Sequence, residues 1–121
     1  MEEKEIWKLI ECQNFLEEAL YLLSMADFWP STTETKVRYL FELIESAERS
    51  IDLSFEELEK SGLKKGFWYW LSVAKGRIEE GEEFARCIIN KIDKKFWKLL
   101  KRARKNLIEV RRALKSGAMS K

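Results

Sequence analysis

The chain has 121 residues, the length of one ordinary domain, and 45% of them are apolar while 36% are charged. This apolar content argues against disorder, and a single proline favours helices over strands. No apolar stretch reaches the ~18 residues that a membrane span requires. We therefore expect one all-α domain over residues 1–121, folded as an antiparallel up-and-down bundle of four main helices and one short helix.

The first residues of the chain are acidic, whereas a secretory signal begins with basic residues, so we expect a cytoplasmic protein. The two cysteines, Cys12 and Cys87, lie far apart in helical stretches and have no CxxC spacing. We expect both to be buried, reduced thiols rather than a disulfide. The Lys- and Glu-rich composition without histidine resembles that of thermophile proteins.

The first helix is predicted over residues 3–27. Glu3 and Glu5 suit the positive end of this helix, and Pro30 ends the segment because a proline displaces the preceding residue from the helical region. Apolar residues recur at helical spacing at Ile6, Leu9, Ile10, Leu16, Ala19, Leu20 and Leu23. This pattern is typical of a helix with one buried face.

The second helix is predicted over residues 32–52, beginning with a capping box in which Ser31 and Glu34 satisfy backbone donors. Its apolar stripe consists of Val37, Leu40, Phe41, Ile44, Ala47 and Ile51. A second box at Ser54 and Glu57 predicts a separate short helix over 55–61. Gly62 would end it in a Schellman motif, with Leu63 reaching back to Leu58.

From residue 64 to about 116 the apolar stripe hardly changes phase, but one helix of that length would be too long for this domain. We place the turn at Gly81, which predicts helices over 64–80 and 82–116. The alternative is a break at 90–93, which would give four helices of similar length but put Lys94 and Lys95 at a positive helix end. A helix over 82–116 would overhang its neighbours and need a partner.

The sequence predicts no catalytic, cofactor or metal site, and we expect the protein not to be an enzyme. Histidine is absent, so the usual general base at neutral pH is missing, and no phosphate-binding glycine motif occurs. Glu42, Glu45 and Glu48 lie largely off the apolar stripe, whereas a carboxylate metal site in a bundle needs inward-facing residues.

Charge is distributed very unevenly along the chain. Residues 1–90 carry 11 basic and 19 acidic side chains, while residues 91–121 carry 12 basic and 2 acidic ones. One interpretation places the basic helix against acidic partners such as Glu11, Glu17, Glu18, Glu42 and Glu45. The other is a polyanion, either nucleic acid or, less favoured, an anionic membrane surface. The candidate nucleic-acid-binding residues are Lys94, Lys98, Lys101, Arg102, Lys105 and Arg112.

The aromatic run at 67–70 cannot be wholly buried by one helix, because Trp68 and Tyr69 point partly away from the apolar stripe. One interpretation is a wide core in which these rings cover the end of the bundle. The other makes Trp68, Tyr69 and Trp97 candidates for an interface with a second copy, since Trp and Tyr are favoured interface residues. Trp97 lies among lysines and is also a candidate for stacking on a base. We expect a non-catalytic interaction protein that forms a homodimer; the alternative is a nucleic-acid-binding protein that does not read sequence.

Overall fold

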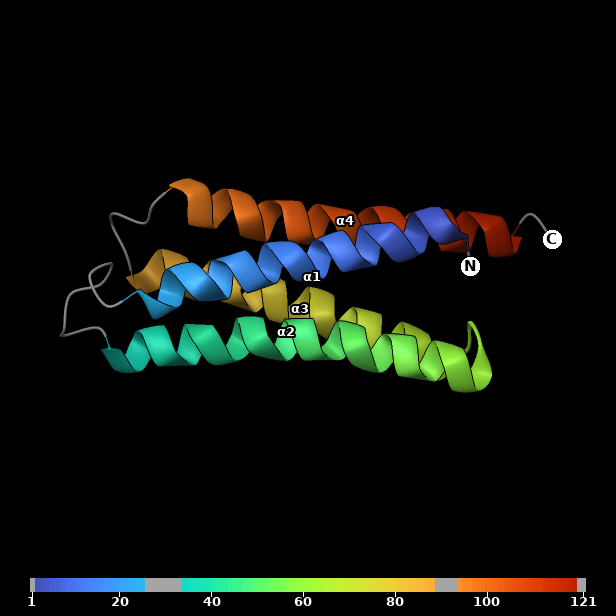
Figure 1. Ribbon diagram of the computed structural model, residues 1–121, viewed down its shortest axis with the longest axis horizontal. Helices are drawn as coiled ribbons and strands as arrows, with labels where there is room; N and C mark the ends of the chain where they lie inside the picture. Colours follow the sequence, from blue (N-terminus) through green and yellow to red (C-terminus); the bar gives the residue numbers. More distant parts are fainter. Residues whose placement is uncertain (1, 26–33, 89–93, 120–121) are drawn as a thin grey trace.

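The computed structural model describes residues 2–25, 34–88 and 94–119, and within these ranges every regular element is a helix (Figure 1). The helices are α1 (Glu3–Ser24), α2 (Glu34–Ser61), α3 (Lys65–Ile88) and α4 (Lys94–Met119). The all-α prediction is confirmed. No helix among the described residues is long and apolar enough to cross a membrane.

The four helices lie side by side along the long axis of the molecule, and the chain reverses direction from each helix to the next (Figure 1). Contacts between α2 and α3 and between α1 and α4 are the most extensive, and α1 also packs on α2. Of these neighbouring pairs, α3 and α4 touch least. Consequently α2 lies diagonally across the bundle from α4.

The core consists of the predicted apolar stripes. Side chains that are fully buried come from every helix and include Leu9, Leu16, Leu40, Ile44, Ile51, Phe67, Leu71, Ile78, Phe96, Leu100, Leu107 and Val110. Within each helix these residues recur at intervals of three, four or seven, so each helix turns one apolar face inward. Fully burying one such side chain stabilises the fold by roughly 1.5–3 kcal/mol.

The predicted short helix over 55–61 is wrong, because α2 continues without a break from Glu34 to Ser61. Ser54 does not cap a helix start. It is buried within α2, and its hydroxyl donates to the carbonyl of Ile51 at 2.6 Å. A serine inside a helix can satisfy its hydroxyl on the preceding turn, so the spacing of Ser54 and Glu57 resembles a capping box without being one.

The predicted helix end at Gly62 is confirmed. Gly62 has a φ of +76°, in the left-handed region that favours glycine. Its amide donates to the carbonyl of Leu58 at 2.9 Å, which is the single bond of an αL cap rather than the paired bonds of a Schellman motif. Leu63 is 40% exposed.

The predicted turn at Gly81 is wrong. Gly81 is buried in the middle of α3, and a side-chain carbon at this position would lie 3.6 Å from Leu40 and 3.8 Å from Ile44 of α2. The glycine therefore lies where α3 packs on α2. The alternative break at 90–93 agrees with the gap between α3 and α4, although residues 89–93 lie outside the described part. The 35-residue helix over 82–116 does not exist, and α4 has 26 residues.

The first helix ends at Ser24, short of the predicted end at Asp27. Glu3 and Glu5 occupy its first turn as expected, whereas the predicted capping box at Ser31 lies outside the described residues.

Cys12 is a free, buried thiol that donates to the carbonyl of Ala103 at 3.2 Å. Burial, helped by the negative charge of Glu11, raises the pKa of this thiol. The side chain of Cys87 lies outside the described residues.

Candidate nucleic-acid interface

Six cationic side chains form one exposed surface on α4, which we call the basic face: Lys94, Lys98, Lys101, Arg102, Lys105 and Arg112. Their intervals of three, four and seven residues put them on one side of a helix. Residues 94 and 112 lie ~27 Å apart along the axis at 1.5 Å per residue. The sequence therefore predicted the members of this surface, and all six are exposed.

The basic face lies opposite the buried side of α4. Phe96, Ala103 and Val110 are fully buried, and at 100° per residue they lie about 100–160° around the helix from the nearest members of the basic face. Because the apolar side chains of α4 point into the core, the cations cannot turn inward to meet acidic groups there. They extend into solvent along the outer side of the bundle.

Only one acidic residue, Glu109, occurs within α4. Lys8 of α1 donates to its carboxylate at 2.6 Å. This hydrogen bond, with the charges of Lys8, Lys105 and Arg112, holds the pKa of Glu109 below its usual range. Glu109 is thus already paired with α1. Lys94, Lys98, Lys101 and Arg102 form no ion pair with any described residue.

Two of the five acidic residues proposed as partners lie far from the basic face. Glu42 and Glu45 belong to α2, which lies across the bundle from α4, and Glu45 pairs with Arg49 on its own helix at 2.9 Å. Glu11 accepts a hydrogen bond from Asn106 at 2.9 Å, and Glu18 is exposed on α1. The order of helices therefore separates Glu42 and Glu45 from the basic face, whereas Glu11 and Glu18 belong to α1, which packs on α4.

Glu17 faces Glu48 of α2 and belongs to a group that we call the acidic cluster: Glu17, Glu45, Glu48 and Asp52. Partial burial, a hydrogen bond with Glu17 and the three neighbouring negative charges raise the pKa of Glu48 to about 7. Gln13 donates to Asp52 at 2.6 Å. Among the described residues, no group of three or more acidic or thiol side chains is arranged to hold a metal ion.

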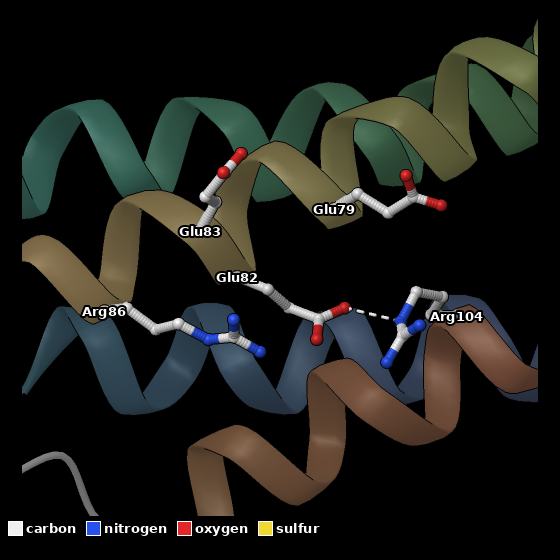
Figure 2. A pocket seen from close by; sticks show the side chains of 5 residues that line it. All are labelled: Glu79, Glu82, Glu83, Arg86 and Arg104. Atoms are coloured by element: carbon white, nitrogen blue, oxygen red, sulfur yellow. Dashed lines mark ion pairs between the residues drawn. The ribbon is translucent and has the colours of Figure 1, made fainter.

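A pocket of about 340 Å³ opens between α3 and α4 and is lined by Glu79, Glu82, Glu83, Arg86 and Arg104 (Figure 2). Glu82, whose side chain is only 10% exposed, lies 2.8 Å from the Nε of Arg104. The two form an ion pair without the alignment of a hydrogen bond. Figure 2 shows that Glu79 and Glu83 point away from this pair. Three carboxylates therefore line the pocket without converging.

A second hollow, of about 330 Å³, lies further along the same contact between helices. Four cationic side chains and one apolar one line it: Lys75, Ile108, Arg111, Arg112 and Lys115. The sequence analysis missed this site because Lys75 belongs to the acidic part of the chain. The spacing of Arg111, Arg112 and Lys115 was the only available signal.

Comparisons with known families, characterised proteins and solved structures give no match to this chain. The site must therefore be interpreted from its own chemistry. Asn106, the one asparagine or glutamine in α4, is buried, and its amide donates to the Lys8 carbonyl at 3.1 Å and to Glu11. It is not available to read a base edge.

The three aromatic interface candidates do not form one surface. Tyr69 is 60% exposed, whereas Trp68 and Trp97 are partly buried against the core. Each tryptophan packs edge-to-face on the preceding phenylalanine. Because α3 and α4 run in opposite directions, Trp68 and Trp97 lie toward opposite ends of the bundle (Figure 1).

Proposed function

We propose that this protein binds nucleic acid without reading its sequence, through the basic face of α4. The observation that carries the proposal is a row of six exposed cations, four of which form no ion pair with any described residue. Nucleic-acid affinity of this kind comes from phosphates, whose neutralisation releases condensed counterions. A row ~27 Å long matches the scale of about one helical turn of a duplex.

One feature favours nucleic acid over an anionic membrane surface. A helix that lies in a membrane interface inserts an apolar face next to its basic one. The apolar residues of α4, such as Leu100 and Leu107, are instead buried in the bundle. No asparagine or glutamine side chain of α4 is available to read adenine, since Asn106 is buried.

The test is a fluorescence-anisotropy titration with two duplexes of unrelated sequence. We expect similar affinities for both, with a Kd of roughly 10⁻⁶ to 10⁻⁴ M near 0.15 M salt. The slope of log affinity against log salt should be about −4 if four or five phosphates are contacted.

The decisive variant is Lys98→Gln/Lys101→Gln/Lys105→Gln, which should flatten that slope by about 1 for each phosphate that is no longer neutralised. A matched control removes the same charge from exposed lysines of α2 and α3, as Lys36→Gln/Lys60→Gln/Lys65→Gln. In this control variant the slope of log affinity against log salt should stay close to that of the wild type. Equal flattening in both variants, or no binding by the wild type even at low salt, would overturn the proposal.

Self-association is a second proposal, supported by exposed apolar side chains at one end of the bundle. Trp7, Leu63 and Tyr69 are 60%, 40% and 60% exposed, and the starts of α1 and α3 lie at the same end (Figure 1). Sedimentation equilibrium tests it directly. We expect a dimer that dissociates when Trp7 and Tyr69 are changed to serine; a single 14.4 kDa species for the wild type would contradict it.

A further inference from the structure

The hollow between α3 and α4 shares Arg112 with the basic face but draws its cations from two helices rather than one. Its cations come from two helices: Lys75 from α3, and Arg111, Arg112 and Lys115 from α4. Lys75 is paired with Glu79 on its own helix at 2.6 Å, and its side chain is only 29% exposed. Arg111 and Lys115 form no ion pair with any described residue.

The local sequence explains why these groups converge. The four α4 residues that line the hollow follow one another at intervals of three, one and three, so they share one side of the helix. On α3, Lys75 lies seven residues before Glu82, which pairs with Arg104, and therefore also points toward α4. The loose contact between α3 and α4 leaves space for the side chains to surround a small volume.

This arrangement brings four cations together around one small volume. Like charges that approach one another repel, and of these four only Lys75 pairs with a described carboxylate, that of Glu79. Lysine and arginine cannot relieve the repulsion by losing a proton near neutral pH, because their pKa values are far above it. A bound anion would relieve it directly.

We infer that this hollow is a binding site for a phosphoryl group. Two guanidinium groups offer paired N–H donors that match the oxygens of a phosphate, and two lysines add point charges. A single carboxylate has fewer acceptor oxygens and less charge than this group of donors can satisfy. If the proposed function holds, on which this step rests, the hollow receives one phosphate of the bound nucleic acid.

Inorganic phosphate tests the site without nucleic acid. At equal ionic strength, phosphate should raise the thermal midpoint of the wild type more than chloride does, because a ligand that binds only the folded state stabilises it. The variant Lys75→Gln/Arg111→Gln should lose this excess. The variant Lys98→Gln/Lys101→Gln removes the same charge from the basic face and should keep it.

A third variant separates binding from folding. Arg111→Lys keeps the charge but loses the planar fork, so it should fold like the wild type and show a reduced phosphate effect. Amide chemical shifts should move around Lys75 and Arg111 on adding phosphate. If both double variants respond equally, or if the shifts move only along the basic face, the inference is overturned.

A second experiment measures the affinity of each variant for one oligonucleotide, prepared with and without a 5′-phosphate. Lys75→Gln/Arg111→Gln should weaken binding about tenfold more than Lys98→Gln/Lys101→Gln, since a fork-bound phosphate is held more strongly than a screened one. A loss confined to the 5′-phosphorylated strand would identify a terminal phosphate, and an equal loss for both would identify a backbone phosphate; either supports the site.

The outcomes distinguish the two proposals. If phosphate binds in the hollow but no nucleic acid binds, the proposed function fails and the phosphoryl site stands. The opposite result has three parts: nucleic acid binds, the two double variants lose affinity equally, and phosphate has no excess effect on the thermal midpoint. In that case the phosphoryl site fails and the proposed function stands.

Discussion

The acidic cluster on α1 and α2 and the basic face on α4 both concentrate like charges, yet they relieve the repulsion differently. In the acidic cluster, Glu48 has a pKa raised to about 7 by burial and by Glu17, so the two carboxyl groups can share a proton near neutral pH. Lysine and arginine have no such recourse, because they lose their protons only far above neutral pH.

The comparison shows why the basic face is the better functional candidate. Protonation of Glu48 relieves part of the repulsion in the acidic cluster without any partner. The basic face has one acidic neighbour in its helix, Glu109, and that residue is already paired with Lys8. Its remaining repulsion must be met by solvent, salt or a bound polyanion, which makes the surface selective for anions.

The largest effect on stability is expected at the ion pair between Glu82 of α3 and Arg104 of α4, in which the glutamate is nearly buried. Changing Arg104 to Gln leaves Glu82 unpaired with a side chain that is 10% exposed, so we expect a loss of roughly 1–3 kcal/mol in the free energy of unfolding. Glu82→Gln should cost less, because Arg104 is 34% exposed and water can solvate it. Urea denaturation measures both, with Arg86→Gln as the control. Equal losses from the two changes would contradict this asymmetry.

The next effect concerns the pH dependence of the acidic cluster. Glu48 has a pKa of about 7 in the folded protein against an ordinary 4.5, so the folded state binds more protons between these values. Stability from this group is therefore complete below about pH 4.5 and is lost as the pH rises to about 7. Glu48→Gln should remove this component of the pH profile.

The matched control for that profile is Glu42→Gln, an exposed position on the same helix. Thermal midpoints measured across this pH range give the comparison. A fall in stability with pH that is the same in Glu48→Gln as in the wild type would show that the shared proton lies elsewhere.

Sequence periodicity predicted the buried faces well, since a three-to-four-residue repeat must turn inward in any helical bundle. It failed where one residue type serves two purposes. Gly81 was interpreted as a turn because glycine tolerates left-handed backbone, but it lies within α3, where it faces Leu40 and Ile44 of α2. Gly62 is also a glycine, and it does adopt the left-handed backbone, with a φ of +76°. A single sequence does not separate these roles.

The candidate site was predictable in part for a related reason. The members of the basic face follow from spacing on one helix, which is local information. Their relation to the acidic residues depends on which helices are neighbours, and the distance of α2 from α4 is a property of the whole fold. The hollow at Lys75 and Arg111 joins two helices and was missed for that reason.

A smaller effect is expected from the one acidic residue on α4. Glu109→Gln removes the only opposing charge within that helix and releases Lys8, so affinity for a duplex should rise a few-fold at low salt. Glu56→Gln, an exposed change on α2, is the control and should leave affinity nearly unchanged. Anisotropy titrations of the two variants side by side decide this. A decrease in affinity for Glu109→Gln would mean that the Lys8 pair positions α4 for binding.

The smallest effect is expected from Lys98→Gln/Lys101→Gln/Lys105→Gln in the absence of ligand. If these lysines served to neutralise acidic helices, removing each pair would cost ~0.2–1 kcal/mol, and added salt would reduce the difference from the wild type. Since Lys98 and Lys101 pair with no described residue, we expect a change in unfolding free energy within about 0.5 kcal/mol. At low salt the change should be a stabilisation, because the variant relieves repulsion along α4.

Urea denaturation at two salt concentrations measures this change in unfolding free energy. A clear destabilisation that salt diminishes would show that the basic face stabilises the fold, and the requirement for an external polyanion would disappear with it.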